Sequence, residues 1–167
     1  MNAVLEASDA LPEAPEARIV ARLRANGRLK EVDLARAQRL HAEAGGSLLS
    51  LLGRLGLVSE RDHAEACAAE LGLPLLGAKS VPEDPPELVD GAQPVSVRFL
   101  RQFHLLPIGE HRGRLQVWMS DPHDGYALDA VRLATGCDIA PAVGLRSEID
   151  DLIERWYGQG RSAMGAI

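Results

Sequence analysis

Asp121, His123 and Asp124 lie within four consecutive positions, and Asp129 follows five residues later. Carboxylate and imidazole groups bind Zn²⁺, Mn²⁺ and Mg²⁺, so this spacing is compatible with a small metal-dependent hydrolase. A strand followed by a helix explains the same residues. Pro122 ends a central strand, and Asp124 stands where an N-cap accepts backbone N–H bonds. With Asp129 then inside the helix, we interpret the segment as a strand end and a helix cap.

No other constellation in the sequence supports catalysis, since no motif such as GxSxG accompanies the histidines. We predict that the remaining histidines are surface or capping residues: His41, His63, His104 and His111. Cys67 and Cys137 lie far apart without a CxxC motif, and we assign no histidine to either. Two buried thiols in a reducing, cytoplasmic setting are therefore expected, with no metal site.

The composition places the chain among globular proteins. It has 167 residues, of which 46% are hydrophobic and 25% charged, enough for one domain or two small ones with a real core. The net charge of −6 argues against a dedicated nucleic-acid binder. No apolar run approaches the roughly 18–20 residues that span a bilayer, and no signal peptide opens the chain.

Three boundaries divide the chain. Residues 1–16 are predicted to be a flexible acidic N-terminus. Residues 17–73 are predicted to form a helical subdomain with two degenerate repeats, because the segments 27–37 and 56–66 align at an offset of 29. The identities are Gly27/Gly56, Glu31/Glu60, Asp33/Asp62, Ala35/Ala64 and Ala37/Ala66, with Leu23/Leu52 upstream. Two such helix–turn–helix units would bury one shared apolar face.

Residues 74–158 are predicted to form an α+β subdomain, and residues 159–167 a linker to an absent ATPase core. A hairpin precedes a helix that ends at Gly136, and a last helix with Ser147 as its N-cap ends at Gly158. The predicted inner face of the first of these helices contains Ala127, Leu128, Val131, Leu133 and Ala134. The fold class is therefore α+β: tandem helix–turn–helix units followed by a small α/β sandwich with a three- to four-stranded sheet.

Three stretches carry a family resemblance: VSVRFLRQFHLLPIG, LQVWMSDPHDGYALDAVRLATG and LRSEIDDLIERWYG. They resemble the N-terminal domain of the type II secretion ATPase (GspE) family, which is related to the N-terminal domains of type IV pilus assembly ATPases. The resemblance covers roughly residues 17–160. It implies a cytoplasmic domain that sits ahead of a hexameric ATPase and binds the cytoplasmic domain of the inner-membrane protein L. Membrane association would then be indirect.

The residues that would hydrolyse ATP in this family are absent from the 167 residues. The sequence contains no GxxxxGK[ST] phosphate loop and no four-cysteine metal module. We therefore expect no catalytic activity from the fragment itself, no cofactor and no nucleic-acid partner, whereas the full-length protein would be an ATPase.

Some relatives of this family bind cyclic di-GMP through tandem sequence units. In each unit, position 1 is Arg, positions 3 and 10 are Gly, position 17 is Leu and position 24 is Gln. The first unit matches at Arg18, Gly27 and Leu34, but Val20 and His41 replace the other Gly and the Gln. The second keeps Gly56 only, with Ser47, Leu49, His63 and Glu70 as replacements. We interpret Arg18, Gly27 and His41 as a vestigial nucleotide site, and a cyclic di-GMP sensor is the alternative function.

Residues 18–41 form a basic segment in an acidic chain. They contain Glu31 and Asp33 against Arg18, Arg22, Arg24, Arg28, Lys30, Arg36 and Arg39. This face could bind an acidic partner or anionic lipid, or it could be an ordinary solvated helix face. Because the resemblance implies a bound partner, we predict contacts to protein L at Leu23, Arg24, Arg28, Leu34 and Arg36.

Overall fold

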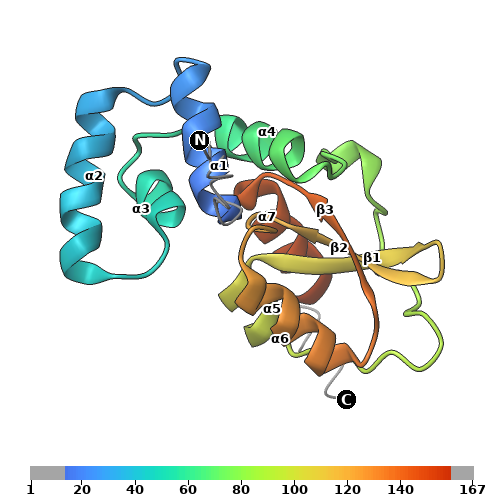
Figure 1. Ribbon diagram of the computed structural model, residues 1–167. Coiled ribbons are helices and arrows are strands. Elements are labelled where there is room, and N and C mark those ends of the chain that lie inside the picture. The colour runs from blue at the N-terminus through green and yellow to red at the C-terminus, as the bar shows by residue number, and fades with distance from the viewer. Residues whose placement is uncertain (1–13, 159–167) are drawn as a thin grey trace, which may run out of the picture.

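The computed structural model describes residues 14–158 of the chain, which fold into a helical unit beside an α+β unit (Figure 1). The helical unit contains α1 (Pro15–Ala25), α2 (Glu31–Ala44), α3 (Leu48–Arg54) and α4 (Glu60–Leu71). In Figure 1, α2 is the outermost helix and α4 lies above the sheet. The flexible N-terminus predicted for residues 1–16 falls largely outside the described residues, but Pro15 and Glu16 belong to α1. The predicted linker 159–167 lies wholly outside them.

The tandem repeats predicted from the sequence are present as two helix–turn–helix units with the same turn. Gly27 and Gly56 occupy equivalent places with φ of 70° and 71°, a conformation that glycine adopts without steric cost. The hydrogen bonds of the two turns also correspond. The N–H of Arg28 donates to Leu23 O at 2.8 Å, and that of Leu57, 29 positions later, donates to Leu52 O at 3.0 Å.

A core of aliphatic side chains holds the helical unit together. α1 packs against α4, and α2 packs against α3. The buried residues include Ile19, Val20, Leu23, Leu34, Ala37, Leu49, Leu52, Ala64 and Cys67. Val143 of the α+β unit belongs to the same cluster, so the two units share buried surface.

The α+β unit is built on a sheet of three strands, β1 (Leu105–His111), β2 (Arg114–Met119) and β3 (Ile139–Val143), in that spatial order. β1 and β2 are antiparallel, and β2 and β3 are parallel through the crossover helix α6 (Gly125–Thr135). A bulge between Pro107 and Gly109 shifts the register of β1. Leu75 forms a single parallel bridge to Val143 on the outer side of β3, so the sheet agrees with the predicted three to four strands.

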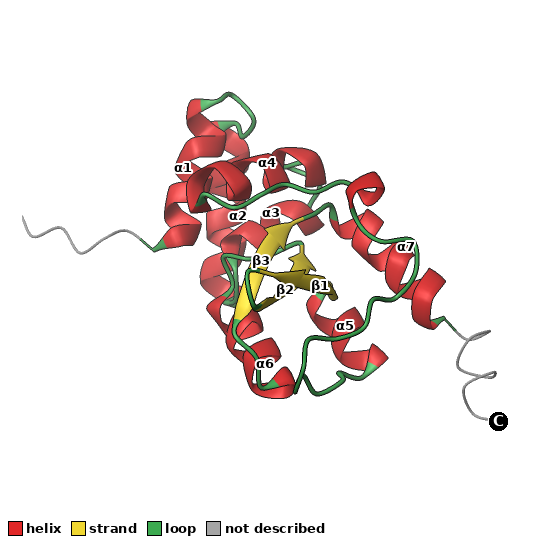
Figure 2. Cartoon of the chain, turned by 90° about the vertical axis from the view of Figure 1, so that its right-hand side faces the viewer, coloured by secondary structure: helices red, strands yellow, loops and turns green. Residues whose placement is uncertain are grey.

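Helices surround this sheet in Figure 2, with the helical unit on one side. The remaining elements are the 3₁₀ turn η1 (Ala78–Ser80), α5 (Val97–Phe103) and α7 (Arg146–Tyr157). α7 packs against β1, β2 and α5. Their buried core includes Leu100, Leu105, Leu115, Val117, Trp118, Val131, Ile149, Leu152 and Trp156. Among the helices of residues 14–158, none has the length and apolar character to cross a membrane.

Local capping signals gave both correct and wrong predictions. Asp124 is the N-cap of α6, where its carboxylate accepts from the N–H groups of Tyr126 and Ala127, and α6 is followed by Gly136 as predicted. Leu133, however, is 84% exposed and does not belong to the inner face of α6. The N-cap prediction for Ser147 is also wrong, because the cap residue of α7 is Leu145, two residues earlier, and the helix begins at Arg146.

Candidate functional site

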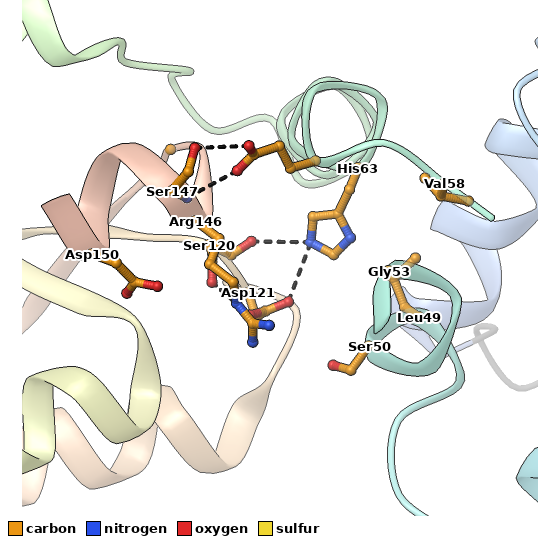
Figure 3. Close-up of a pocket in the computed structure, with 12 residues that line it drawn as sticks. Leu49, Ser50, Gly53, Val58, His63, Ser120, Asp121, Arg146, Ser147 and Asp150 are labelled. Carbon is orange, nitrogen blue, oxygen red and sulfur yellow. Dashed lines mark hydrogen bonds and ion pairs between the residues drawn. The ribbon is translucent and has the colours of Figure 1, made fainter. Parts of the chain in front are cut away.

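A cavity of about 310 Å³ lies where the two units meet. α3 and the start of α4 form one wall, and the end of β2 with the start of α7 forms the other (Figure 3). Its apolar lining includes Leu49 and Val58. Its polar lining contains Ser50, Glu60, His63, Ser120, Asp121, Arg146, Ser147 and Asp150. The sequence analysis did not connect these residues, because they come from segments up to 101 positions apart, from Leu49 to Asp150.

His63 and Asp121 form the polar centre of this boundary. His63 Nε2 lies 3.1 Å from the carbonyl oxygen of Ser120 and 3.2 Å from Asp121 Oδ1. The Ser120 hydroxyl donates to Asp121 Oδ2 at 2.6 Å, and Arg146 Nη2 lies 3.9 Å from the same oxygen. The prediction that His63 is a surface or capping residue is therefore wrong, since its side chain joins α4 to the end of β2.

This contact favours the charged pair. Burial by itself lowers the pKa of His63, but the hydrogen bonds to Asp121 and Cys67 outweigh it and raise that pKa to about 10. For Asp121, burial raises the pKa, whereas the hydrogen bond and charge of His63 lower it well below its usual range. Both shifts favour an imidazolium paired with a carboxylate at the contact between the two units.

A second group lies next to this pair. Cys67 Sγ is 4.0 Å from His123 Nδ1, and the rings of His63 and His123 meet edge to face with centroids 5.8 Å apart. Burial raises the pKa of the Cys67 thiol, but hydrogen bonds to His123 and His63 lower it overall. The structure thus contradicts our assignment of no histidine to Cys67. A sequence signal existed, because His63 precedes Cys67 by four residues, one turn of α4.

The three residues of the hydrolase hypothesis have separate tasks. Asp121 binds His63, His123 faces Cys67, and Asp124 caps α6. Asp129 lies inside α6 and pairs with Arg132. Within residues 14–158, the group of side chains that could hold a metal ion is instead His63, Cys67 and His123.

The residues of the vestigial nucleotide site are engaged within the chain. Arg18 Nε lies 3.2 Å from Glu70, the residue that replaces the second glutamine of the ligand pattern, and Arg22 Nε lies 2.9 Å from it. His41 Nε2 lies 2.7 Å from the carbonyl oxygen of Gly46, and Gly27 shapes its turn. These contacts hold the unit together without a ligand.

A second carboxylate lies at the start of α3. Glu16 accepts hydrogen bonds from the hydroxyl of Ser47 and, at 2.7 Å, from the N–H of Leu49. Ser47 and Leu49 are the residues that replace the first arginine and glycine in the second repeat. A negative charge therefore lies beside two positions at which the second repeat departs from the ligand pattern.

The predicted partner-binding residues divide into buried and exposed sets. Leu23 and Leu34 are 1% and 5% exposed in the helical core, so their side chains are not on the surface. Arg24 pairs with Glu31, and Arg28 lies 3.7 Å from Asp62. Arg36 is exposed and forms no ion pair within residues 14–158.

The outer face of α2 offers surface that the sequence analysis missed. Val32 is 78% exposed, although valine is a residue that usually enters a core. It lines a shallow groove with Ala35, Gln38, Arg39 and Ala42. The spacing of these residues places them along one face of the helix. The available signal was that Val32 falls outside the apolar stripe that Leu34 and Ala37 form on α2.

Comparison with known proteins agrees with the architecture. Residues 71–163 match the MshEN domain family. The chain is 64% identical over 152 residues to Type II secretion system protein E of Xanthomonas campestris pv. campestris, which covers 91% of this chain and 27% of that protein. It is 35% identical over 121 residues to the type IV pilus assembly ATPase PilB of Thermus thermophilus, covering 69% of this chain and 13% of PilB. The chain thus spans about a quarter or less of these relatives.

Solved structures show the same fold. The N-terminal domain of XpsE matches with a TM-score of 0.79 and 60% identity, covering 87% of this chain and 97% of that one. A second crystal form of that domain matches with a TM-score of 0.64 and 62% identity, covering 85% and 96%. MshE in complex with c-di-GMP matches with a TM-score of 0.63 and 24% identity, covering 84% and 99%, a likeness of fold alone.

Proposed function

The chain belongs to the MshEN domain family and to the N-terminal domains of type II secretion ATPases, and we propose that it is a non-catalytic docking domain of that motor. Its proposed partner is the cytoplasmic domain of the inner-membrane protein L. Through this contact the domain recruits the ATPase to the cytoplasmic side of the membrane. We assign ATP hydrolysis to the rest of the full-length protein. In this proposal the ATPase part forms a hexamer, and this domain belongs to the same chain.

The observation that carries this proposal is the unpartnered outer face of α2. α2 packs against α3, and its opposite side carries the exposed Val32 and two arginines, Arg36 and Arg39. Neither arginine forms an ion pair with another of the described residues, whereas Arg18 and Arg22 are held by Glu70. Within residues 14–158, two arginines without an ion pair and one exposed apolar side chain thus lie on the same face of α2.

This combination fits an acidic segment of the partner with at least one apolar side chain. Burying Val32 would contribute about 1.5 kcal/mol to association. The arginines would mainly raise the association rate and restrict the choice of partner, since exposed charges contribute little to affinity on their own. Their effect should weaken as salt is added, because ions screen exposed charges.

The docking proposal is tested by reversing the free charges. We expect Arg36→Glu with Arg39→Glu to weaken binding to the protein L cytoplasmic domain roughly tenfold or more at low salt, measured by calorimetry or surface binding. Its matched control is Arg98→Glu with Arg155→Glu, which changes the net charge equally on exposed positions of the α+β unit. The control should bind within about twofold of the original chain, as expected for charges outside an interface.

Two outcomes would reject this interface. Unchanged binding of the α2 variant would exclude the basic face of α2, and equal weakening by the control would indicate non-specific charge attraction. Arg24 and Arg28 remain proposed contacts of lower weight, because each already lies beside a carboxylate of its own unit.

A cyclic di-GMP sensor is the second candidate, favoured by the tandem units and by the retained Arg18 and Gly27. The carboxylates of Glu16 and Glu70 oppose it, since they occupy the donors that would meet a dianionic ligand. We therefore expect no heat of binding in calorimetry with cyclic di-GMP at high micromolar concentration. A saturable isotherm with one ligand per chain would instead favour the sensor over the docking domain as the function.

A further inference from the structure

The group of His63, Cys67 and His123 crosses the boundary between the two units. His63 and Cys67 project from successive turns of α4, and His123 comes from the loop between β2 and α6. One ligand atom from each residue lies within 4.8 Å of the others. Neither the docking surface on α2 nor the vestigial nucleotide site includes any of the three.

We propose that His63, Cys67 and His123 bind a Zn²⁺ ion that ties α4 to the β2–α6 loop. Two imidazoles and a thiolate are a ligand set that zinc prefers, whereas Mg²⁺ and Ca²⁺ require oxygen ligands. The proposal departs from the expectation of no metal site, which considered the cysteines without their spatial neighbours.

The separations of the candidate ligand atoms approach those of a zinc site, with one at 4.0 Å and all within 4.8 Å. Zn–N bonds of about 2.0 Å and Zn–S bonds of about 2.3 Å at tetrahedral angles place N and S about 3.6 Å apart. Cys67 Sγ and His123 Nδ1 are 4.0 Å apart, so a shift of a few tenths of an ångström would bring them to that separation. The other two separations are at most 4.8 Å, so binding of the ion would have to draw these side chains closer by up to about 1 Å.

Asp121 supplies the outer support that zinc-binding histidines usually have. Its carboxylate lies 3.2 Å from His63 Nε2, and the carbonyl oxygen of Ser120 lies 3.1 Å from the same atom. With Nε2 engaged in this way, Nδ1 is the nitrogen that the metal would take. A carboxylate on the far nitrogen orients the ring and increases its basicity. The fourth position would be left for water, as in other sites with three protein ligands.

The first repeat shows that these residues are not needed for the helix–turn–helix itself. At the offset of 29, His63 corresponds to Leu34 and Cys67 to Gln38. Within the repeats, candidate ligands therefore occur only in the copy that packs on the α+β unit, whose loop supplies His123. A buried cysteine alone would be an ordinary core residue, but here two imidazoles surround a thiol that is 0% exposed.

Metal titration of the tag-free, chelator-treated chain tests the proposal. We expect one Zn²⁺ per chain with a Kd below about 1 μM, and a rise in the temperature of unfolding when zinc is added. Co²⁺ should give a thiolate-to-metal absorption band in the near ultraviolet and the strong visible bands of a tetrahedral site. The spectrum requires no mutation, so it does not depend on whether a variant folds.

Cys67→Ser and His123→Ala should each weaken zinc binding roughly 100-fold or more and remove the cobalt spectrum. Cys137→Ser is the matched control, because Cys137 is the other free thiol and lies outside the group. It should bind zinc as the unchanged chain does. A lack of stoichiometric zinc binding by the unchanged chain, or loss of the cobalt band in Cys137→Ser but not in Cys67→Ser, would overturn the proposal.

Discussion

The first repeat, α1 with α2, leaves the outer face of α2 open, whereas the second repeat, α3 with α4, lies against the α+β unit through α4. Their turns have the same glycine conformation and the same hydrogen bonds. Their surroundings differ at one pair of equivalent positions. Leu34 is buried among aliphatic side chains, and His63 binds Ser120 and Asp121 of the other unit.

This difference shows how a repeated scaffold takes two roles. The apolar positions and the turn are kept in both copies, because they build the shared core. Polar residues are introduced in the second copy where it meets the sheet, and they fix its position there. Among residues 14–158, the outer face of the first copy makes no such contacts, which is why we propose it as the docking face.

The largest effect should come from the core positions that the repeats share. Leu23 and Leu52 are equivalent and almost fully buried, so Leu23→Ala and Leu52→Ala should each lower the free energy of unfolding by about 3 kcal/mol. Urea unfolding followed by circular dichroism measures both. A cost below 1 kcal/mol for Leu23→Ala alone would mean that the first repeat does not unfold together with the rest.

An intermediate effect is expected where the repeats differ. His63→Leu gives the second repeat the residue of the first, but it leaves the carbonyl of Ser120 and the carboxylate of Asp121 without their imidazole. We expect metal-free protein to lose about 2 kcal/mol in the free energy of unfolding, because buried acceptors lose a hydrogen bond. If the variant were as stable as the unchanged chain, packing at the boundary would hold the two units together without the hydrogen bonds of His63.

The smallest effect should come from the turns. Gly27→Ala and Gly56→Ala place a Cβ in open space at both positions, so only the positive φ penalises alanine. Each substitution should therefore cost about 1 kcal/mol in the free energy of unfolding. Because the two turns match, the two costs should agree within experimental error in the same urea experiment. Unequal costs would indicate that one turn changes conformation.

Much of the fold could be predicted from the sequence, because local rules govern it. Hydrophobic spacing located the helices, the repeat offset identified the tandem units, and Asp124 caps α6 as its sequence position suggests. Each of these signals involves residues that are neighbours along the chain.

The contacts between units could not be predicted, because they join residues far apart in sequence. The spacing predicts Ser147 as an N-cap, but its own N–H and hydroxyl donate to the carboxylate of Glu60, 87 positions away. One of the free N–H groups at the start of α7 is therefore satisfied by a distant side chain. His63 and Asp121 meet only once α4 lies against the end of β2. Leu23 and Leu34 were predicted as surface contacts because helical spacing does not tell which apolar face a neighbour covers.

The two edge strands of the sheet affect whether copies of this domain aggregate when many are held close together. Open backbone groups along an outer strand can recruit the strand of a neighbouring molecule and begin aggregation. Here β1 carries a bulge and the N–H-free Pro107, while Leu75 occupies part of the outer side of β3. Crowded copies should therefore stay separate at their sheets and remain free to associate through their helices.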